Sequence, residues 1–162
     1  MVMSMVMSMV MSIVMSMVMS FAQYSPIILS CFLIIYLIYT HHIYNVLLVG
    51  SLFIFLNGVI ALLKYVIARE RDPECLKLLV RDFTFPMIDK YSMPSGHSAI
   101  AGFITGLLSR EWKLVFMIIS LVIMFQRVIY KCHTIVECII GFAIGYIFGL
   151  LSERKIQNQH KN

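Results

Sequence analysis

The chain has 162 residues, of which 60% are hydrophobic and 13% are charged, and its mean hydropathy is +0.90. A soluble domain of this length cannot bury so much apolar surface, so the composition predicts an integral membrane protein. The formal net charge of +5 comes from short segments between apolar runs and from the C-terminus. Because no continuous basic face results, a nucleic-acid-binding protein is excluded.

The N-terminus carries a tetrapeptide repeat. MVMS recurs in five near-copies over the first twenty residues, with Ile13 as the only substitution, and no charged side chain occurs up to Phe21. Twenty-one residues in an α-helix extend about 30 Å, which is the thickness of the hydrocarbon core of a bilayer. We therefore expect residues 1–22 to form a first transmembrane helix. A cleaved signal peptide is the alternative, and the absence of Lys and Arg from its start argues against it.

Further apolar segments follow the repeat, over residues 26–39, 46–67, 97–108, 112–125 and 134–151. Together with the repeat they predict an all-α fold, a polytopic membrane bundle of about six transmembrane helices. Several segments are shorter than the roughly 17 residues that a perpendicular helix needs, so flanking polar residues are recruited or the bilayer thins locally. The expected organisation is the low-complexity repeat at 1–22, a membrane core at 23–152 and a polar C-terminal tail at 153–162.

Glycines recur at four-residue spacing in two of these segments. The fourth span has Gly102 and Gly106, and the sixth has Gly141, Gly145 and Gly149. Small residues along one stripe let two helix backbones approach closely. We expect the stripes to pack helices within one chain, because several short spans must be held together. A homo-oligomer formed through the same stripes is the alternative.

The longest polar stretch, residues 68–93, connects the third span to the fourth. Leu76, Leu79, Val80 and Phe83 recur within it at helical spacing, which is typical of a short helix lying among lipid headgroups. A solvated connector is an equally good interpretation of this stretch.

Four cysteines occur, Cys31, Cys75, Cys132 and Cys138, without the CxxC spacing of a zinc site. Cys75 and Cys132 fall in connections on the same side of the membrane, where a disulfide would form if that side were oxidising. The simpler expectation is two free thiols. The adjacent His41 and His42 lack cysteine or acidic neighbours, so no metal site is expected there.

Three cations and a glycine-containing turn point to an anion site. Lys64 and Arg71 lie seven residues apart, Arg127 follows the fifth span, and Pro94-Ser95-Gly96-His97 opens the fourth. A phosphate monoester is dianionic near neutral pH, so three cations would dominate its binding. A turn that precedes a helix also offers backbone N–H groups and the positive end of the helix dipole. The pattern predicts phosphate binding by Lys64, Arg71, Ser95, Gly96 and Arg127.

Two histidines and a carboxylate supply the expected catalytic groups. Glu137 follows His133 by four residues, which places both side chains on one helical face. A carboxylate in that place fixes the imidazole tautomer and stabilises a cationic intermediate, so His133 is the candidate nucleophile. The imidazole of His97, at the start of the fourth span, is suited to protonate a departing oxygen.

The order and spacing of these residues, from Lys64 through Pro94-Ser95-Gly96-His97 to Glu137, resemble the three-part signature of the type 2 phosphatidic acid phosphatase (PAP2) superfamily, which includes the vanadium haloperoxidases. The signature covers residues 64–137. The resemblance implies a hydrolase of the lipid phosphatase branch that cleaves a lipid phosphate or polyprenyl diphosphate through a phosphohistidine at His133, with His97 as general acid. It also implies a multi-pass location among membrane lipids and a reaction that needs no metal and no other cofactor.

Three positions depart from the family pattern. Asp72 separates an arginine from a proline, Gln126 stands where a serine is common, and Glu137 replaces an aspartate. The extra methylene of Glu137 would move its carboxylate by about 1.5 Å unless the side chain folds back, and misplacement on this scale costs about a hundredfold in rate. We therefore expect reduced but real activity.

The side of the membrane that the site faces stays open. Lys and Arg are equally numerous on the two sides once Lys64, Arg71 and Arg127 are set aside, so the positive-inside rule does not orient the chain. The alternative function is that of a catalytically weak or inactive protein of the same fold, serving as a scaffold or lipid binder. A pore built on the glycine stripes is a third alternative.

Overall fold

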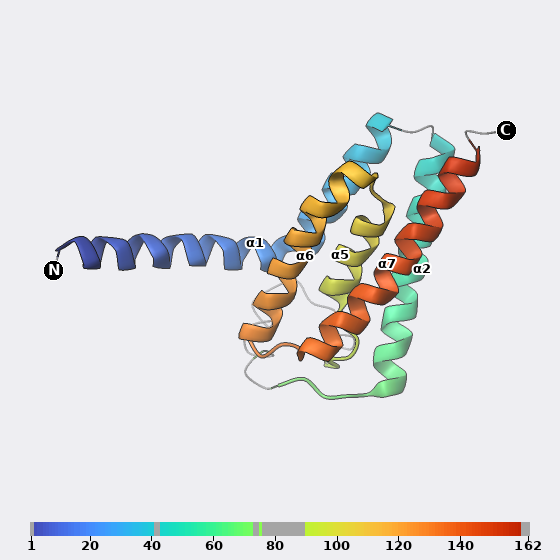
Figure 1. Ribbon diagram of the computed structural model, residues 1–162. Helices are drawn as coiled ribbons and strands as arrows, with labels where there is room; N and C mark the ends of the chain where they lie inside the picture. The colour runs from blue at the N-terminus through green and yellow to red at the C-terminus, as the bar shows by residue number, and fades with distance from the viewer. Residues whose placement is uncertain (1, 41–42, 73–74, 76–89, 160–162) are drawn as a thin grey trace.

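The computed structural model describes residues 2–40, 43–72, 75 and 90–159. These residues form five helices: α1 (Val2–Thr40), α2 (Ile43–Ile67), α5 (Gly96–Leu107), α6 (Arg110–Ile129) and α7 (Ile135–Gln159) (Figure 1). Within these residues, the one extended pairing is an antiparallel bridge between Glu70 and Tyr91. The predicted all-α fold is confirmed. The short helix expected around 76–83 and the pair at 41–42 lie outside the described residues.

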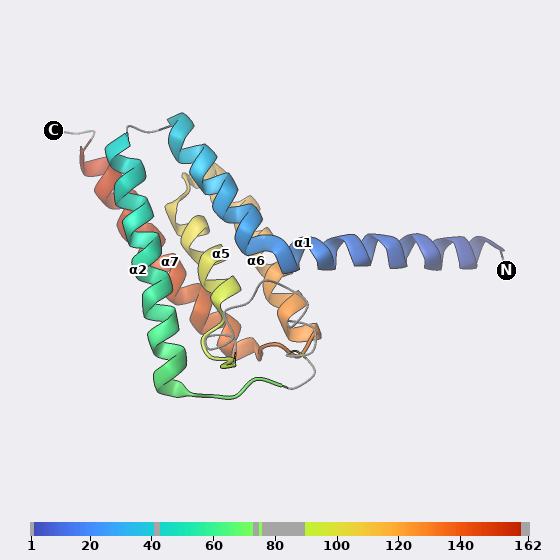
Figure 2. The same ribbon diagram turned by 180° about the vertical axis from the view of Figure 1, so that it is seen from behind.

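The MVMS repeat is helical, as predicted, but it is continuous with the apolar segment that follows it. α1 runs for 39 residues and includes Pro26. Residues 22–25 contain neither glycine nor a charged side chain, so nothing in them ends the helix. The first half of α1 projects away from the other helices, and its second half lies along them (Figures 1 and 2).

α5 is the central helix of the bundle. It contacts α1, α2, α6 and α7, and every residue from Ser98 to Leu107 except Ile100 is buried. Twelve residues in a helix extend only about 18 Å, less than the thickness of a bilayer core. α5 therefore lies inside a wall of longer helices, with α2 beside α7 and the second half of α1 beside α6 (Figure 2).

The glycine stripes form a seam between α5 and α7. A Cβ atom added at any of five glycines would overlap a backbone oxygen across the seam; these are Gly102, Gly106, Gly141, Gly145 and Gly149. The backbones are therefore in direct contact, and the predicted packing within one chain is confirmed. The seam also reaches the start of α5, because the backbone oxygen of Ser95 faces Gly141.

Three of the described helices are long and apolar enough to cross a membrane, over Asn45–Ile67, Arg110–Ile129 and Ile135–Asn158. Their outward side chains are apolar and exposed, as at Ile54 (73%) and Leu114 (71%). Exposing such an apolar surface to water costs free energy, whereas contact with lipid does not, so the chain is a membrane protein.

The end of the chain extends the last helix. Residues 153–159, expected as a polar tail, continue α7 as far as Gln159. An ion pair joins Lys113 Nζ to Glu153 Oε2 at 2.9 Å and ties the start of α6 to this last part of α7. The polar composition of the segment therefore does not interrupt its helical backbone.

Candidate active site

The residues singled out from the sequence gather at one end of the bundle (Figure 1). Lys64 lies in the last turn of α2, and Arg127 in the last turn of α6. Ser95 is the N-cap of α5, while His133 precedes α7 and Glu137 lies in its first turn. Two connections, α2 to α5 and α6 to α7, thus bring residues far apart in the sequence to one place.

His133 and Glu137 form a buried pair. Their exposed fractions are 5% and 1%, and Nδ1 of His133 lies 3.3 Å from Oε2 of Glu137. The carboxylate is therefore placed to accept a hydrogen bond from Nδ1–H, which leaves Nε2 of His133 as the unprotonated ring nitrogen.

Glu137 is held by the start of its own helix. Its Oε2 accepts a hydrogen bond of 2.9 Å from the backbone N–H of Thr134, and Thr134 Oγ1 accepts one of 3.3 Å from the N–H of Glu137. This reciprocal pair is a capping box, in which a glutamate reaches back to the residue before the helix. The side chain is therefore folded back, and the extra methylene of Glu137 is used by the cap.

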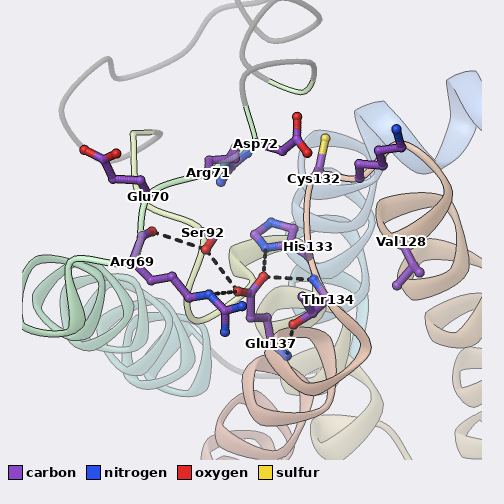
Figure 3. Close-up of a pocket in the computed structure, with 11 residues that line it drawn as sticks. Arg69, Glu70, Arg71, Asp72, Ser92, Val128, Cys132, His133, Thr134 and Glu137 are labelled. Atoms are coloured by element: carbon purple, nitrogen blue, oxygen red, sulfur yellow. Dashed lines mark hydrogen bonds and ion pairs between the residues drawn. The ribbon is translucent and has the colours of Figure 1, made fainter.

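Two residues that the sequence did not single out hold the other carboxylate oxygen. Arg69 Nε lies 3.3 Å from Glu137 Oε1, and the hydroxyl of Ser92 lies 3.0 Å from the same atom (Figure 3). An arginine that lies next to a span, as Arg69 does, is typical of a headgroup anchor. Its position two residues before Arg71 was the one available signal.

Positive charge surrounds His133. Lys64, Arg71 and Arg127 are buried, at 5%, 6% and 3% exposure. The pKa of His133 is lowered from 6.5 to about 4, first because burial penalises the cation and also because these three charges repel it, while the hydrogen bond to Glu137 raises it in part. His133 is therefore neutral at pH 7. Three buried cations around one neutral imidazole make this place suited to an anion.

The start of α5 closes another side of the site. Ser95 Oγ accepts a hydrogen bond from Ser98 N at 3.4 Å and one from Ser98 Oγ at 3.0 Å, and so caps the helix. The N–H of Ser95 donates to the backbone oxygen of Glu137 at 3.2 Å. A Cβ at Gly96 would meet nothing within 4 Å, so there is open space beside this glycine at the start of α5.

Arg127 connects the two histidines. Its Nη2 lies against the ring of His97, 2.9 Å from Nδ1. Its backbone oxygen accepts a hydrogen bond of 3.2 Å from the N–H of His133. One residue thus contacts both the first-turn histidine of α5 and the backbone of the loop before α7.

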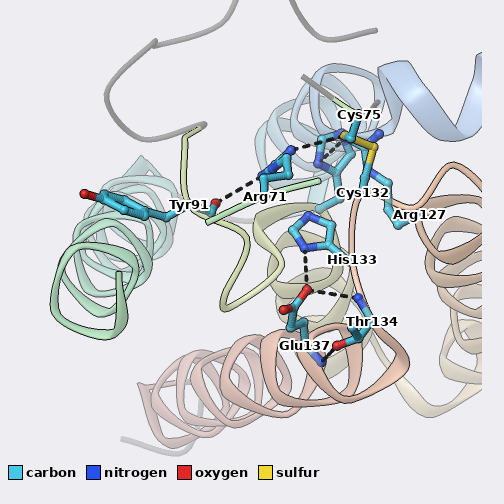
Figure 4. The surroundings of a disulfide bond; sticks show 9 residues. Arg71, Cys75, Tyr91, Arg127, Cys132, His133, Thr134 and Glu137 are labelled. Carbon is cyan, nitrogen blue, oxygen red and sulfur yellow. Dashed lines mark hydrogen bonds and ion pairs between the residues drawn. A yellow bond between two sulfur atoms is a disulfide. The ribbon is translucent and has the colours of Figure 1, made fainter. Parts of the chain in front are cut away.

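A disulfide joins Cys75 to Cys132, with the Cα atoms 4.9 Å apart (Figure 4). The expectation of two free thiols is therefore wrong. The bond connects the segment that carries Arg71 to the residue directly before His133. Arg71 is also held by the backbone, since its Nη2 donates to the oxygen of Tyr91 at 3.3 Å. The sequence placed the two cysteines on one side, but it could not show their distance.

A pocket of about 480 Å³ opens beside His133. Of the predicted site residues, Arg71, His133 and Glu137 line it, together with Arg69, Ser92 and Asp72 (Figure 3). Lys64, Ser95, Gly96, His97 and Arg127 are not among the residues that line it. Within the described part of the chain, no three His, Cys, Asp or Glu side chains are close enough to hold a metal ion. The pocket has the buried histidine–carboxylate pair on one wall, and its lining carries both cationic and acidic side chains.

The fold and the site together define a class of protein: an all-helical membrane protein with a polar pocket at one end of its helix bundle. A family model described as the PAP2 superfamily matches residues 44–161, well over half of the chain. The chain belongs to this superfamily. The matched region contains the whole site and begins after α1, so the repeat lies outside it. Neither a curated protein nor a solved structure matches the chain.

Proposed function

We propose that the chain is a multi-pass membrane phosphatase that hydrolyses a phosphomonoester or pyrophosphate bond of a lipid through a phosphohistidine. The observation that carries the proposal is the buried, neutral His133, backed by Glu137 and surrounded by three cations. A neutral imidazole is a nucleophile at physiological pH, and the cations supply what a phosphate dianion needs. Each cation about 4 Å from the phosphate contributes on the order of 4 kcal/mol at an effective dielectric near 20, before desolvation is subtracted.

The first step follows from the orientation of His133. Nδ1 faces Glu137, so Nε2 attacks phosphorus and forms the N–P bond as the bond from phosphorus to the lipid oxygen breaks. His97 donates its proton to that oxygen. The positive charge that develops on the His133 ring is stabilised by the Glu137 carboxylate.

Water completes the reaction. His97, now unprotonated, takes a proton from a water molecule whose oxygen attacks phosphorus, and the N–P bond breaks to release inorganic phosphate and neutral His133. In the structure Arg127 lies against the His97 ring. A bound phosphate competes for that guanidinium, and its negative charge favours the protonated imidazole that the first step needs.

A lipid substrate is supported by the surroundings of the pocket. The site lies at the end of helices whose outward faces are apolar and exposed. A volume of about 480 Å³ accommodates a phosphorylated headgroup, while the hydrocarbon chains stay in the bilayer. We assign the chemistry to the core at residues 23–152 and none to the repeat at 1–22.

Phosphate release by purified protein in detergent tests the proposal, with phosphatidic acid and a polyprenyl diphosphate as parallel substrates. A His133→Ala variant is the control, and wild-type release is expected to exceed it by at least a hundredfold on one substrate. Isotopically labelled substrate, quenched with alkali because phosphohistidine is labile in acid, should give a labelled wild-type protein. Equal release by both proteins together with saturable binding of the lipid would instead indicate a non-catalytic lipid-binding protein.

A further inference from the structure

We infer that Arg69 and Ser92 are positioning residues that fix the Glu137 carboxylate against His133, an inference that rests on the proposed phosphatase function. Neither residue is one of the three buried cations or the catalytic groups. Both contact Glu137 Oε1, the oxygen that does not face the histidine.

The carboxylate of Glu137 is fixed on both sides. Oε2 faces Thr134 N at 2.9 Å and His133 Nδ1 at 3.3 Å. Oε1 faces Ser92 Oγ at 3.0 Å and Arg69 Nε at 3.3 Å. Two donors on each oxygen define the plane of the carboxylate as well as its position, so the acceptor presented to His133 has one orientation.

The reach of a glutamate is essential to this arrangement. The capping box needs a side chain long enough to return to Thr134 N, and glutamate or glutamine has that length. An aspartate at 137 has one methylene fewer, about 1.5 Å. It cannot keep the contacts to the helix start and to Arg69 together. The residue that departs from the family pattern is therefore matched by partners that suit it.

Arg69 and Ser92 also support each other. The backbone oxygen of Arg69 accepts from Ser92 N at 2.8 Å and lies 3.2 Å from Ser92 Oγ. The single hydroxyl hydrogen of Ser92 is thus shared between that oxygen and Glu137. The same pairing continues to Arg71, whose N–H donates to the oxygen of Lys90 at 3.2 Å. Glu137 is thereby coupled to the segment that carries a phosphate-binding cation.

The exposure of Arg69 makes its role measurable. Its side chain is 55% exposed, and exposed ion pairs contribute little to folding stability. A change at Arg69 should therefore alter the orientation of Glu137 without unfolding the protein. A charge-assisted hydrogen bond of this kind, screened by water, corresponds to about a fivefold to tenfold effect on rate.

The test is a double-mutant cycle between Arg69 and Glu137. Arg69→Ala should lower kcat about fivefold to tenfold, with a smaller change in KM, because the contact to Glu137 acts on the imidazolium formed during the reaction. In a Glu137→Asp background, where the contact is already lost, the same change should cost less than twofold. Arg69→Lys should restore part of the rate, and Ser92→Ala should resemble Arg69→Ala. Arg154→Ala, at an exposed position on α7, is the matched control.

Proton NMR gives a readout that needs no turnover. The His133 Nδ1–H hydrogen bonded to a carboxylate should resonate far downfield, and Arg69→Ala should move or broaden this signal while Arg154→Ala leaves it unchanged. An unchanged signal, or equal loss of kcat from Arg69→Ala in both backgrounds, overturns the inference. A wild-type protein that shows the signal and its dependence on Arg69 but releases no phosphate would refute the proposed function and keep the positioning role.

Discussion

The substitution Glu137→Gln removes the negative charge behind His133. A glutamine keeps the length of the side chain and is the other residue type found in capping boxes, so the start of α7 should stay intact. The hydrogen bond from Thr134 N–H should be kept, because an amide oxygen accepts it as a carboxylate oxygen does. What is lost is the negative charge opposite the imidazolium that forms during phosphoryl transfer, together with the acceptor that faces Arg69, because the amide nitrogen takes the place of Oε1.

The expected rate loss follows from the separation of the two groups. Nδ1 of His133 and Oε2 of Glu137 are 3.3 Å apart, and unit charges at that distance attract by about 5 kcal/mol at an effective dielectric near 20. The amide dipole and solvent recover part of this, which leaves about 3 kcal/mol, or about 150-fold in rate.

The assay is the rate of phosphohistidine formation in a single turnover, with thermal unfolding measured on the same samples. Glu137→Gln should slow the step about a hundredfold or more and shift the unfolding temperature by no more than a few degrees. Glu153→Gln changes a glutamate at the other end of the same helix and should leave the rate unaltered. A Glu137→Gln rate within threefold of wild type would refute the electrostatic role of this carboxylate.

Three further predictions concern the seam, the buried imidazole and the disulfide. Gly145→Ala should force α5 and α7 apart, lower the unfolding temperature by about 5 °C or more and reduce activity, whereas Gly50→Ala, which meets nothing within 4 Å, should be neutral or slightly stabilising. The pKa of His133 is lower in the folded protein than in the unfolded chain, so the unfolded chain binds the proton first as the pH falls. The free energy of unfolding should therefore decrease by about 3 kcal/mol between pH 6.5 and pH 4. Unfolding measured as a function of pH should show this decrease for the wild type and not for His133→Ala. Replacing Cys75 and Cys132 by serine should lower the free energy of unfolding by up to about 4 kcal/mol, because the disulfide closes a loop of 57 residues, and it should raise KM. Cys31→Ser, at an exposed free cysteine, is the control and should change neither quantity. Unchanged KM and stability in the double variant would show that the disulfide does not hold the segment of Arg71 in place.

Much of the architecture could be predicted from local patterns. Apolar runs predicted the helices, apart from the expected break between residues 22 and 26, which does not occur in α1. The four-residue glycine spacing predicted the α5–α7 seam, because close approach of two helices needs small residues. The convergence of His97, Arg127 and His133 at one end follows from counting spans between them. These features depend on periodicity and order along the chain, which a sequence displays directly.

The remaining features depend on distances between segments, which a sequence does not display. Arg69 next to a span is indistinguishable from a headgroup anchor until Glu137 is seen beside it. The disulfide requires two cysteines, 57 residues apart, to meet. The rate loss expected for a glutamate at position 137 assumed an extended side chain. The capping box with Thr134 instead holds this side chain folded back. Tertiary partners, rather than propensities, decided each of these points.

The disulfide between Cys75 and Cys132 makes this site depend on the redox conditions of the compartment that it faces. Glutathione keeps such thiols reduced in the cytosol, while extracellular and lumenal spaces allow them to stay joined. The disulfide is therefore stable only when the end of the bundle that carries His133 faces an extracellular or lumenal space. In that orientation, the proposed lipid substrate would belong to the non-cytosolic leaflet.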